Sequence, residues 1–395
     1  MNTQILKILW HKKEKQFFFF VEILIIFFVI TMTFLYGYDH LKNYFVKLGY
    51  ETKNQYIVRA DFNSFKDSVE LVRIKKLLSQ EIKQVDGVES VAWVSGSAPM
   101  TFNNWGFGND DLGFRYHANF LGADKNIVSA LELNIVKGRG FEQDDYNDKY
   151  IPIIINKKLY DLIAKAKGHE MVDSIYTAFT EFHIVGVVDH YKQNSEFQKE
   201  GYYLIALDHP LFLDNIGGGL TKLLIKTKDG ANPSFQSKIS STYGDVAKIH
   251  DIYINQLDED RKHESASYWL QLIAIGIIAL FLLINISLGL IGILSHNISQ
   301  RKSEIGLRKA LGATTSQVVK QFVGEVMLVA GAALLVGLMV ILQLPYVTEF
   351  EFEKKDLFIA TALSLTFIII LLLLSSIVPS LHGAQIEPST ALHEE

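Results

Sequence analysis

The hydrophobic residues of this chain are concentrated in four long blocks that stand apart from a stretch of mixed composition. The blocks cover residues 17–37, 268–294, 322–345 and 357–381, and the second and fourth contain no charged residue. A helix rises about 1.5 Å per residue, so about 20 apolar residues cross a membrane. Uncharged runs of this length are rare in soluble proteins, and we therefore predict four transmembrane helices.

The first block also resembles a signal peptide, because Lys12, Lys13 and Lys15 precede it. Its apolar run is longer than the roughly 7–15 residues of a signal-peptide core, and no small-residue cleavage site follows it. We interpret it as a retained transmembrane helix.

Lysine and arginine residues in the flanks predict the orientation of the spans. Basic residues are abundant in segments 1–16 and 295–321, whereas the loop 346–356 is acidic. Cytoplasmic flanks carry the excess of Lys and Arg. We therefore expect both basic segments to be cytoplasmic and residues 38–267 to be extracytoplasmic. The loop 346–356 then lies outside and the tail 382–395 inside.

Two carboxylates, Glu22 and Glu325, fall inside the predicted spans. Intramembrane acids are functional candidates because they are costly to bury. Both lie about one turn from a predicted cytoplasmic interface, so we favour interfacial or helix-contact roles over a proton relay.

The large segment between the first two spans has the pattern of a folded α+β domain. Alternation and turn residues predict strands and helices that together indicate two lobes built on mixed or antiparallel sheet. The predicted strands cover 56–60, 88–94, 114–121, 151–155, 182–188, 202–207, 223–227 and 249–254, and the predicted helices cover 69–85, 157–167 and 233–243. The stretch 96–113 is a polar loop that contains Phe102, Trp105 and Phe107. These aromatic side chains either contact a partner or pack onto their own domain.

Motifs for catalysis and metal binding are absent from the sequence. There is no P-loop, no H-E-x-x-H and no G-x-S-x-G, and the chain contains no cysteine. No activated nucleophile is evident near Asp189 and His190, so we interpret them as polar residues at the protein surface. The mild net charge of -5 argues against nucleic-acid binding. We expect no catalytic residue, no metal site and no cofactor in this chain.

Residues 295–320 predict a short helix, a turn and the restart of a helix. Glu304 and Arg308 are four residues apart, as are Leu307 and Leu311. Gly312 is placed to end the helix, and Thr314 with Gln317 forms a capping box. These features fit a lever that another protein pushes, and they fit a simple basic connection equally well.

The stretch Arg301 to Ala313, with sequence RKSEIGLRKALGA, closely resembles the cytoplasmic segment of FtsX-like ABC permeases of the MacB type. Further segments are similar to patterns of that family, although each is weak by itself. They are Val136–Phe141 followed by Asp144 and Asp145, Ile153–Asn156, Phe182–Asp189, and the ending Ile386–Leu392.

The resemblance implies a permease subunit in the bacterial inner membrane that pairs with a second copy or with a sister permease. It implies a separate ABC ATPase that binds ATP and Mg²⁺, since the fused ATPase domain of MacB is not in this sequence. Other implied partners are membrane lipid, a periplasmic adaptor and an outer-membrane duct. The residues implied to couple to the ATPase are Arg301, Lys302, Glu304, Ile305, Gly306, Arg308, Lys309, Leu311 and Gly312.

In such a permease, ATP hydrolysis moves the outer domains rather than opening a channel. The leading hypothesis is mechanotransmission for efflux of a peptide, antibiotic or other amphiphile. Release of lipoproteins from the membrane and signalling to a cell-wall hydrolase are alternatives within the family. A non-transporting sensor is the least favoured, because it needs only two spans and a cytoplasmic output domain.

Overall fold

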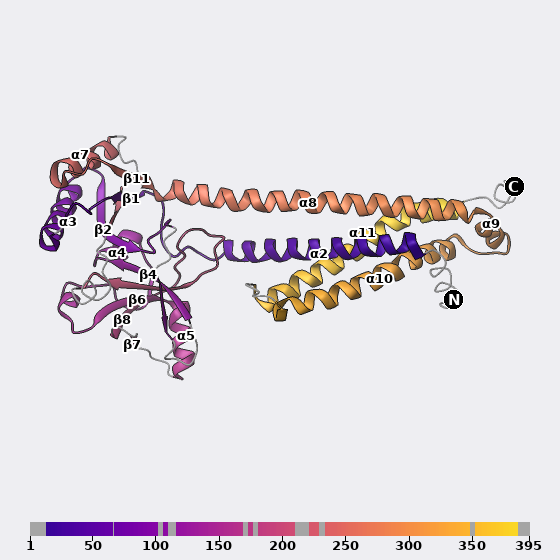
Figure 1. Ribbon diagram of the computed structural model, residues 1–395, viewed down its shortest axis with the longest axis horizontal. Coiled ribbons are helices and arrows are strands. Elements are labelled where there is room, and N and C mark those ends of the chain that lie inside the picture. The colour runs from indigo at the N-terminus through magenta and orange to yellow at the C-terminus, as the bar shows by residue number, and fades with distance from the viewer. Residues whose placement is uncertain are drawn as a thin grey trace. The chain divides into compact units, whose positions relative to one another are not determined.

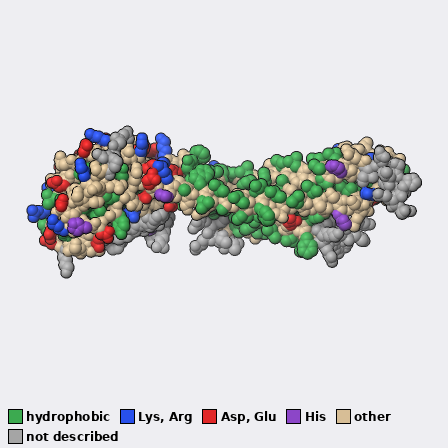
Figure 2. All heavy atoms as spheres, turned by 90° about the horizontal axis from the view of Figure 1, so that it is seen from above, with side chains coloured by type: hydrophobic (Ala, Val, Ile, Leu, Met, Phe, Trp, Pro, Cys, Tyr) green, Lys and Arg blue, Asp and Glu red, His purple; other side chains and the backbone are tan. Residues whose placement is uncertain are grey.

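The chain forms two compact units, which we call the helical unit (Met1–Leu41 and Trp269–Glu395) and the sheet unit (Lys42–Tyr268). The computed structural model describes residues 13–65, 67–101, 106–109, 116–168, 173–176, 181–209, 221–228, 234–347 and 352–385 (Figure 1). Hydrophobic side chains gather over the helical unit, whereas Lys, Arg, Asp and Glu gather over the sheet unit (Figure 2).

Four helices are long and apolar enough to cross a membrane, as the sequence predicted. They are α2 (Lys13–Tyr44), α8 (Leu257–Gln300), α10 (Thr315–Val347) and α11 (Lys354–Ala384), and the short α9 (Lys302–Ala310) lies between α8 and α10. The polar first turns of α8 belong to the sheet unit, because the boundary between the units falls after Tyr268.

The four long helices share one hydrophobic core. Side chains that are 0% exposed from each helix meet there, among them Phe27, Ile286, Ala330 and Ile368. Helices α10 and α11 run side by side (Figure 1). At Gly337 of α10 an added Cβ would lie 2.5 Å from Phe27 Cδ1, so the absence of a side chain lets the Phe27 ring pack there. Glu22 lies against α8, with its carboxylate oxygens 3.7 Å from the Cβ position of Gly289.

Within the described residues, eleven strands of the sheet unit join in one sheet. The order along the sheet is β11-β1-β10-β2-β4-β9-β6-β8-β5, with β3 on β4 and β7 on β8. The strands are β1 (Gln55–Ala60), β2 (Val88–Gly96), β3 (Gly106–Asn109), β4 (Tyr116–Ala123), β5 (Ile135–Gly138), β6 (Ile151–Asn156), β7 (Ser174–Tyr176), β8 (Glu181–Val188), β9 (Tyr202–Leu207), β10 (Lys222–Thr227) and β11 (Ile252–Gln256). The pairs β4–β9 and β6–β8 are parallel and the others antiparallel, so the sheet is mixed, which is one of the two forms that the sequence predicted.

The two expected lobes take the form of two regions of this continuous sheet, each with helices of its own. In one region α3 (Ser68–Lys83) and α7 (Phe235–Ala247) cover β1, β2, β10 and β11, and Leu78 and Ile239 are 0% exposed. In the other, α5 (Lys157–Lys167) covers β6, β8 and β9. A third cluster, which includes α4 (Ile127–Leu131), packs on the opposite face of β1 and β2.

Local signals explain where these elements begin and end. The Asn156 side chain caps α5 by accepting from Leu159 N at 3.3 Å, and Gly168 closes the helix with a φ of 63°, so that α5 covers the predicted range 157–167. The last strand starts later than predicted, at Ile252, because Lys248 ends α7 in the left-handed region and Ile249 N still bonds to Tyr243 O.

Candidate functional site

The segment between α8 and α10 folds as a short helix with a defined turn at each end. Arg301 leaves α8 through a bond from its N–H to Ile298 O, and its own carbonyl accepts from Ile305 N in α9. Gly312 ends the segment with a φ of 98°, a conformation that suits glycine. The predicted capping box is confirmed, since Thr314 N donates to Gln317 Oε1 at 2.9 Å and Gln317 N donates to Thr314 Oγ1 at 3.3 Å.

An ion pair holds the beginning of α9 to α10. Arg301 Nη1 donates to both oxygens of Glu325, at 2.9 and 3.1 Å, and the two side chains are only 12% and 13% exposed. Gln321 Nε2 adds a bond to Glu325 Oε1 at 3.3 Å. Glu325 therefore has a helix-contact role, which is one of the two interpretations that its position in the sequence favoured.

Apolar packing and two further bonds fix the rest of α9. Ile305 is 4% exposed and Gly306 is also buried. The gap between α9 and α10 has a volume of about 10 Å³, which is enough for at most one water molecule. Arg308 donates to Gln321 Oε1. Lys309 Nζ donates to Ala384 O at 2.7 Å, which satisfies a carbonyl group at the end of α11.

The outer side of the segment is apolar as well as charged. Leu307 is 54% exposed and Leu311 is 81% exposed, and both belong to a polar segment rather than to a span. Glu304 and Arg308 pair at 2.5 Å with both side chains 44% exposed. Burying a leucine stabilises an interface by about 1.5–3 kcal/mol, so these two side chains form a suitable docking surface for another protein.

The structure thus divides the predicted site residues between two sides of one helix. Arg301 and Lys309 bond to α10 and α11, and Ile305 and Gly306 are buried, so these four residues lie on the anchored side of the helix. The exposed positions are Glu304, Arg308, Leu311 and Gly312, while Lys302 is intermediate. Sequence reasoning named neither Gln321 nor Glu325 as anchors of this helix, because only the fold shows which α10 side chains face it.

The structure describes only part of the polar loop 96–113 that contains the three aromatic residues. Phe102 and Trp105 lie outside the described residues, and Phe107 lies in β3, where it is in register with Ala118 of β4. The C-terminal segment Ile386–Leu392 also lies outside the described residues.

A second motif from the sequence has a structural role in the sheet unit. Arg139 donates to both oxygens of Asp145, at 2.6 and 2.7 Å, and Asp145 Oδ2 also accepts from Glu142 N at 2.7 Å. Burial opposes ionisation of this carboxyl, but the bonds from Arg139 and Glu142 outweigh it and lower the pKa of Asp145. The motif therefore locks the turn that follows β5.

Comparisons with known proteins agree with this division into parts. Residues 268–388 match the family described as FtsX-like permease C-terminal. The macrolide export ATP-binding/permease protein MacB of Neisseria meningitidis serogroup A is 23% identical over 274 residues, which cover 67% of this chain and 40% of that protein. MacB of Chromobacterium violaceum is 24% identical over 296 residues, which cover 71% of this chain and 44% of that protein. The chain thus spans less than half the length of these curated relatives.

Solved structures give weaker similarities. The periplasmic region of MacB from Actinobacillus actinomycetemcomitans is 14% identical, with a TM-score of 0.37 and coverage of 53% of this chain and 92% of that one. The extracellular domain of YknZ, a transporter from Gram-positive bacteria, is 12% identical, with a TM-score of 0.35 and coverage of 51% and 100%. Residues 268–388 are thus similar to the C-terminal part of FtsX-like permeases, and the longer matches are to proteins of the MacB type; like the prediction from the sequence, the chain has four apolar helices and a sheet unit between the first and the second.

Proposed function

We propose that this chain is the permease subunit that couples ATP hydrolysis in a separate ABC ATPase to movement of the sheet unit. The ATPase binds ATP and Mg²⁺, docks on α9 at the cytoplasmic side, and meets the exposed Leu307 and Leu311. The permease pairs with a second copy or a sister permease, and its cargo is a peptide, antibiotic or other amphiphile.

The observation that carries the proposal is the two-sided construction of α9. Its inner side is tied to α10 by the Arg301–Glu325 pair and to α11 by Lys309. Its outer side exposes the apolar side chains of Leu307 and Leu311 to solvent, and their burial against a partner would be favourable. A push on the outer side is therefore transmitted to two long helices rather than absorbed by a loose loop. The relatives' names, which specify macrolide export, support efflux as the process.

The absence of cysteine from the chain makes the docking side directly testable. Leu311→Cys, in otherwise unaltered protein in native membranes, should crosslink to an ABC ATPase through a thiol-reactive probe. The matched control is Val69→Cys in the sheet unit, a side chain that is 74% exposed and should capture no ATPase. Equal capture from both positions, or none from Leu311→Cys, would contradict the docking surface.

Coupling is tested with the same ATPase and the cysteine-free chain reconstituted together without a crosslink. The variants Leu307→Ser with Leu311→Ser, and Glu304→Ala with Arg308→Ala, should remove the permease-dependent part of ATP hydrolysis and leave the rate of the ATPase alone unchanged. If both double variants stimulate hydrolysis as well as the wild type, the coupling role of α9 is wrong.

The efflux assignment has its own measurement. A strain that lacks the chain should become sensitive to an amphiphilic antibiotic or peptide, and the wild-type chain should restore resistance. Unchanged sensitivity together with mislocalised lipoproteins would replace efflux by lipoprotein release.

A further inference from the structure

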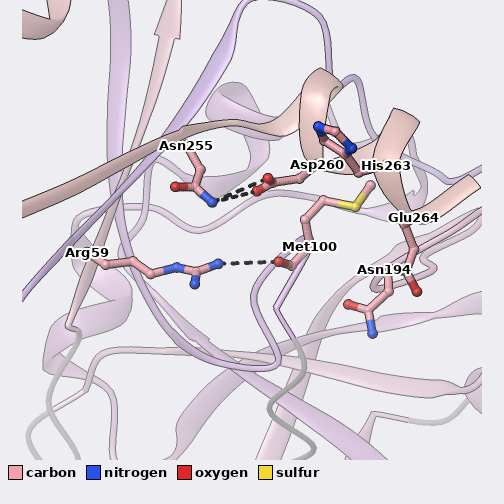
Figure 3. Close-up of a pocket in the computed structure, with 7 residues that line it drawn as sticks. All are labelled: Arg59, Met100, Asn194, Asn255, Asp260, His263 and Glu264. Atoms are coloured by element: carbon pink, nitrogen blue, oxygen red, sulfur yellow. Dashed lines mark hydrogen bonds between the residues drawn. The ribbon is translucent and has the colours of Figure 1, made fainter. Parts of the chain in front are cut away.

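The sheet unit contains a cavity of about 230 Å³ at the place where β1, β11 and the first turns of α8 meet. Its lining is mostly polar, and Figure 3 shows side chains from several separate segments converging on it. The lining residues are Arg59, Met100, Asn194, Asn255, Asp260, His263 and Glu264. The volume is below the roughly 300–1,000 Å³ of sites for drug-sized ligands, so the cavity suits a small molecule.

One side of the cavity carries a cation, Arg59, that has no acidic partner among the described residues. Arg59 is directly opposite Lys222 in the β1–β10 register, so two like charges share one face of the sheet. Among the described residues, the guanidinium of Arg59 reaches only Met100 O, at 3.4 Å, and its Nε is buried with no acceptor. Lys222 Nζ donates to Gly96 O at 3.5 Å and has no acidic partner in the part of the chain that the structure describes. Burial, together with the charge of Arg59, lowers the pKa of Lys222 to about 8.

The other side of the cavity carries acidic groups. Asp260 accepts from Asn255 Nδ2 at 3.1 and 3.3 Å, whereas Glu264 has no hydrogen bond or ion pair with any part of the chain that the structure describes. Burial raises the pKa of the Glu264 carboxyl. Asn194 Oδ1 is buried beside the cavity without a donor.

These groups destabilise the unit in the absence of a ligand. Like charges directly opposite on a sheet repel each other, and each buried polar atom without a partner costs about 1–3 kcal/mol. Polar groups left unsatisfied in this way are typical of a site that a ligand completes. No ion pair joins Arg59 to Asp260 or Glu264 across the cavity.

We propose that this cavity binds a small zwitterion, with its carboxylate or phosphate group at Arg59 and its ammonium group at Glu264. Asn194 and His263 add hydrogen bonds between these two charged ends, and Met100 contacts the carbon chain. The site lies wholly within the sheet unit and does not depend on the proposed contact between α9 and an ATPase. The ligand is either a free amino-acid-like molecule or the headgroup of a zwitterionic lipid, since both have this chemistry.

The test measures binding to the purified full chain without any ATPase. Titration calorimetry with O-phosphoethanolamine and with glycine should give dissociation constants at least tenfold lower than those for inorganic phosphate, acetate or ethylamine. A competition experiment then distinguishes the free molecule from the lipid headgroup. Nanodiscs of phosphatidylethanolamine and nanodiscs of phosphatidylglycerol are each tested for the ability to displace phosphoethanolamine. Competition by phosphatidylethanolamine alone assigns the lipid headgroup, and competition by neither assigns a free molecule.

Variants on both sides of the cavity complete the test. Arg59→Gln and Glu264→Gln should each weaken binding of the zwitterion at least tenfold. Matched controls are Glu259→Gln on the same helix, whose side chain is 55% exposed, and the exposed Arg73→Gln on α3, and both should bind normally. Arg59→Gln should also unfold at the same or a higher temperature than the ligand-free wild type, because the substitution removes a like-charge contact.

Three results would overturn the proposal. One is the absence of binding by every probe. Another is equal affinity for phosphate and phosphoethanolamine combined with normal binding by Glu264→Gln, which would leave an anion site only. The third is a large fall in the unfolding temperature of Arg59→Gln with no change in binding, which would assign Arg59 a structural role.

Discussion

The anchor between Arg301 and Glu325 makes a quantitative prediction about how firmly α9 is held. Glu325→Gln keeps the size of the side chain but leaves Arg301 without a counter-charge at a position that is only 12% exposed. Exposed ion pairs contribute about 0–1 kcal/mol, whereas breaking a fully buried pair costs about 3–5 kcal/mol. The pair lies between these limits, so we expect α9 to lose about 2 kcal/mol of local stability.

Hydrogen exchange measures this local stability without unfolding the protein. Amides of α9, such as Ile305 N, which bonds to Arg301 O at 2.9 Å, exchange when the helix opens locally. A loss of about 2 kcal/mol corresponds to roughly 30-fold faster exchange. Amides of α11 that are far from the pair should keep their rates, which confirms that the effect is local.

Two further variants isolate the charge as the cause. Glu304→Gln removes the partner of Arg308 in a pair that is 44% exposed on both sides, so exchange should accelerate by about threefold or less. The double variant Arg301→Met with Glu325→Leu removes both charges and should recover most of the protection. An anchoring role of the Arg301–Glu325 pair is refuted if Glu325→Gln exchanges no faster than Glu304→Gln, or if the double variant exchanges as fast as Glu325→Gln.

Three other predictions concern packing and burial elsewhere in the chain. Asn156→Ala removes the cap of α5 at Leu159 N and leaves buried groups unpaired, so the sheet unit should lose about 2–3 kcal/mol in thermal unfolding of the full chain; an unchanged midpoint would contradict this. Burial raises the pKa of Asp124 to about 6, although two backbone hydrogen bonds oppose the shift. The protonated carboxyl therefore stabilises the fold at pH values below the unfolded-state pKa of about 4, and this stabilisation is lost as the pH rises through 6. The wild type should therefore gain about 2 kcal/mol relative to Asp124→Asn between pH 7 and pH 4, and equal pH profiles would refute the assignment. Gly337→Ala places a methyl group 2.5 Å from Phe27 Cδ1 and should cost about 1–3 kcal/mol, with partial rescue by Phe27→Leu in the same unfolding assay; no loss would show that the contact is not tight.

Features with a local physical cause could be predicted from the sequence. The limits of α5 follow from Asn156 and Gly168, and the turn before α10 follows from Thr314 and Gln317. Capping depends on residues within one turn of each other, so the sequence contains the whole interaction. The last strand was predicted less well, because the left-handed residue Lys248 delays its start.

Features that depend on distant partners could not be predicted in the same way. The sequence showed Arg301 and Glu325 as separate charges, and nothing local indicated that they pair. Likewise, the eight predicted strands were expected in two lobes, whereas backbone hydrogen bonds between β4 and β9, about 80 residues apart, join the two regions into one sheet.

By itself, then, the sequence determined the four apolar helices, the α+β nature of the insert and the helix in the polar segment. Each depends on composition or on spacing within a few turns, because the free energy of moving apolar residues out of water is roughly additive along the chain. Only the tertiary structure decided which sides of α9 are anchored and which are exposed. It also decided that Arg59 lies opposite Lys222, and that both are on the face of the sheet where the cavity opens. Strand register places such pairs, and register is set by the packing of the whole sheet rather than by any short segment.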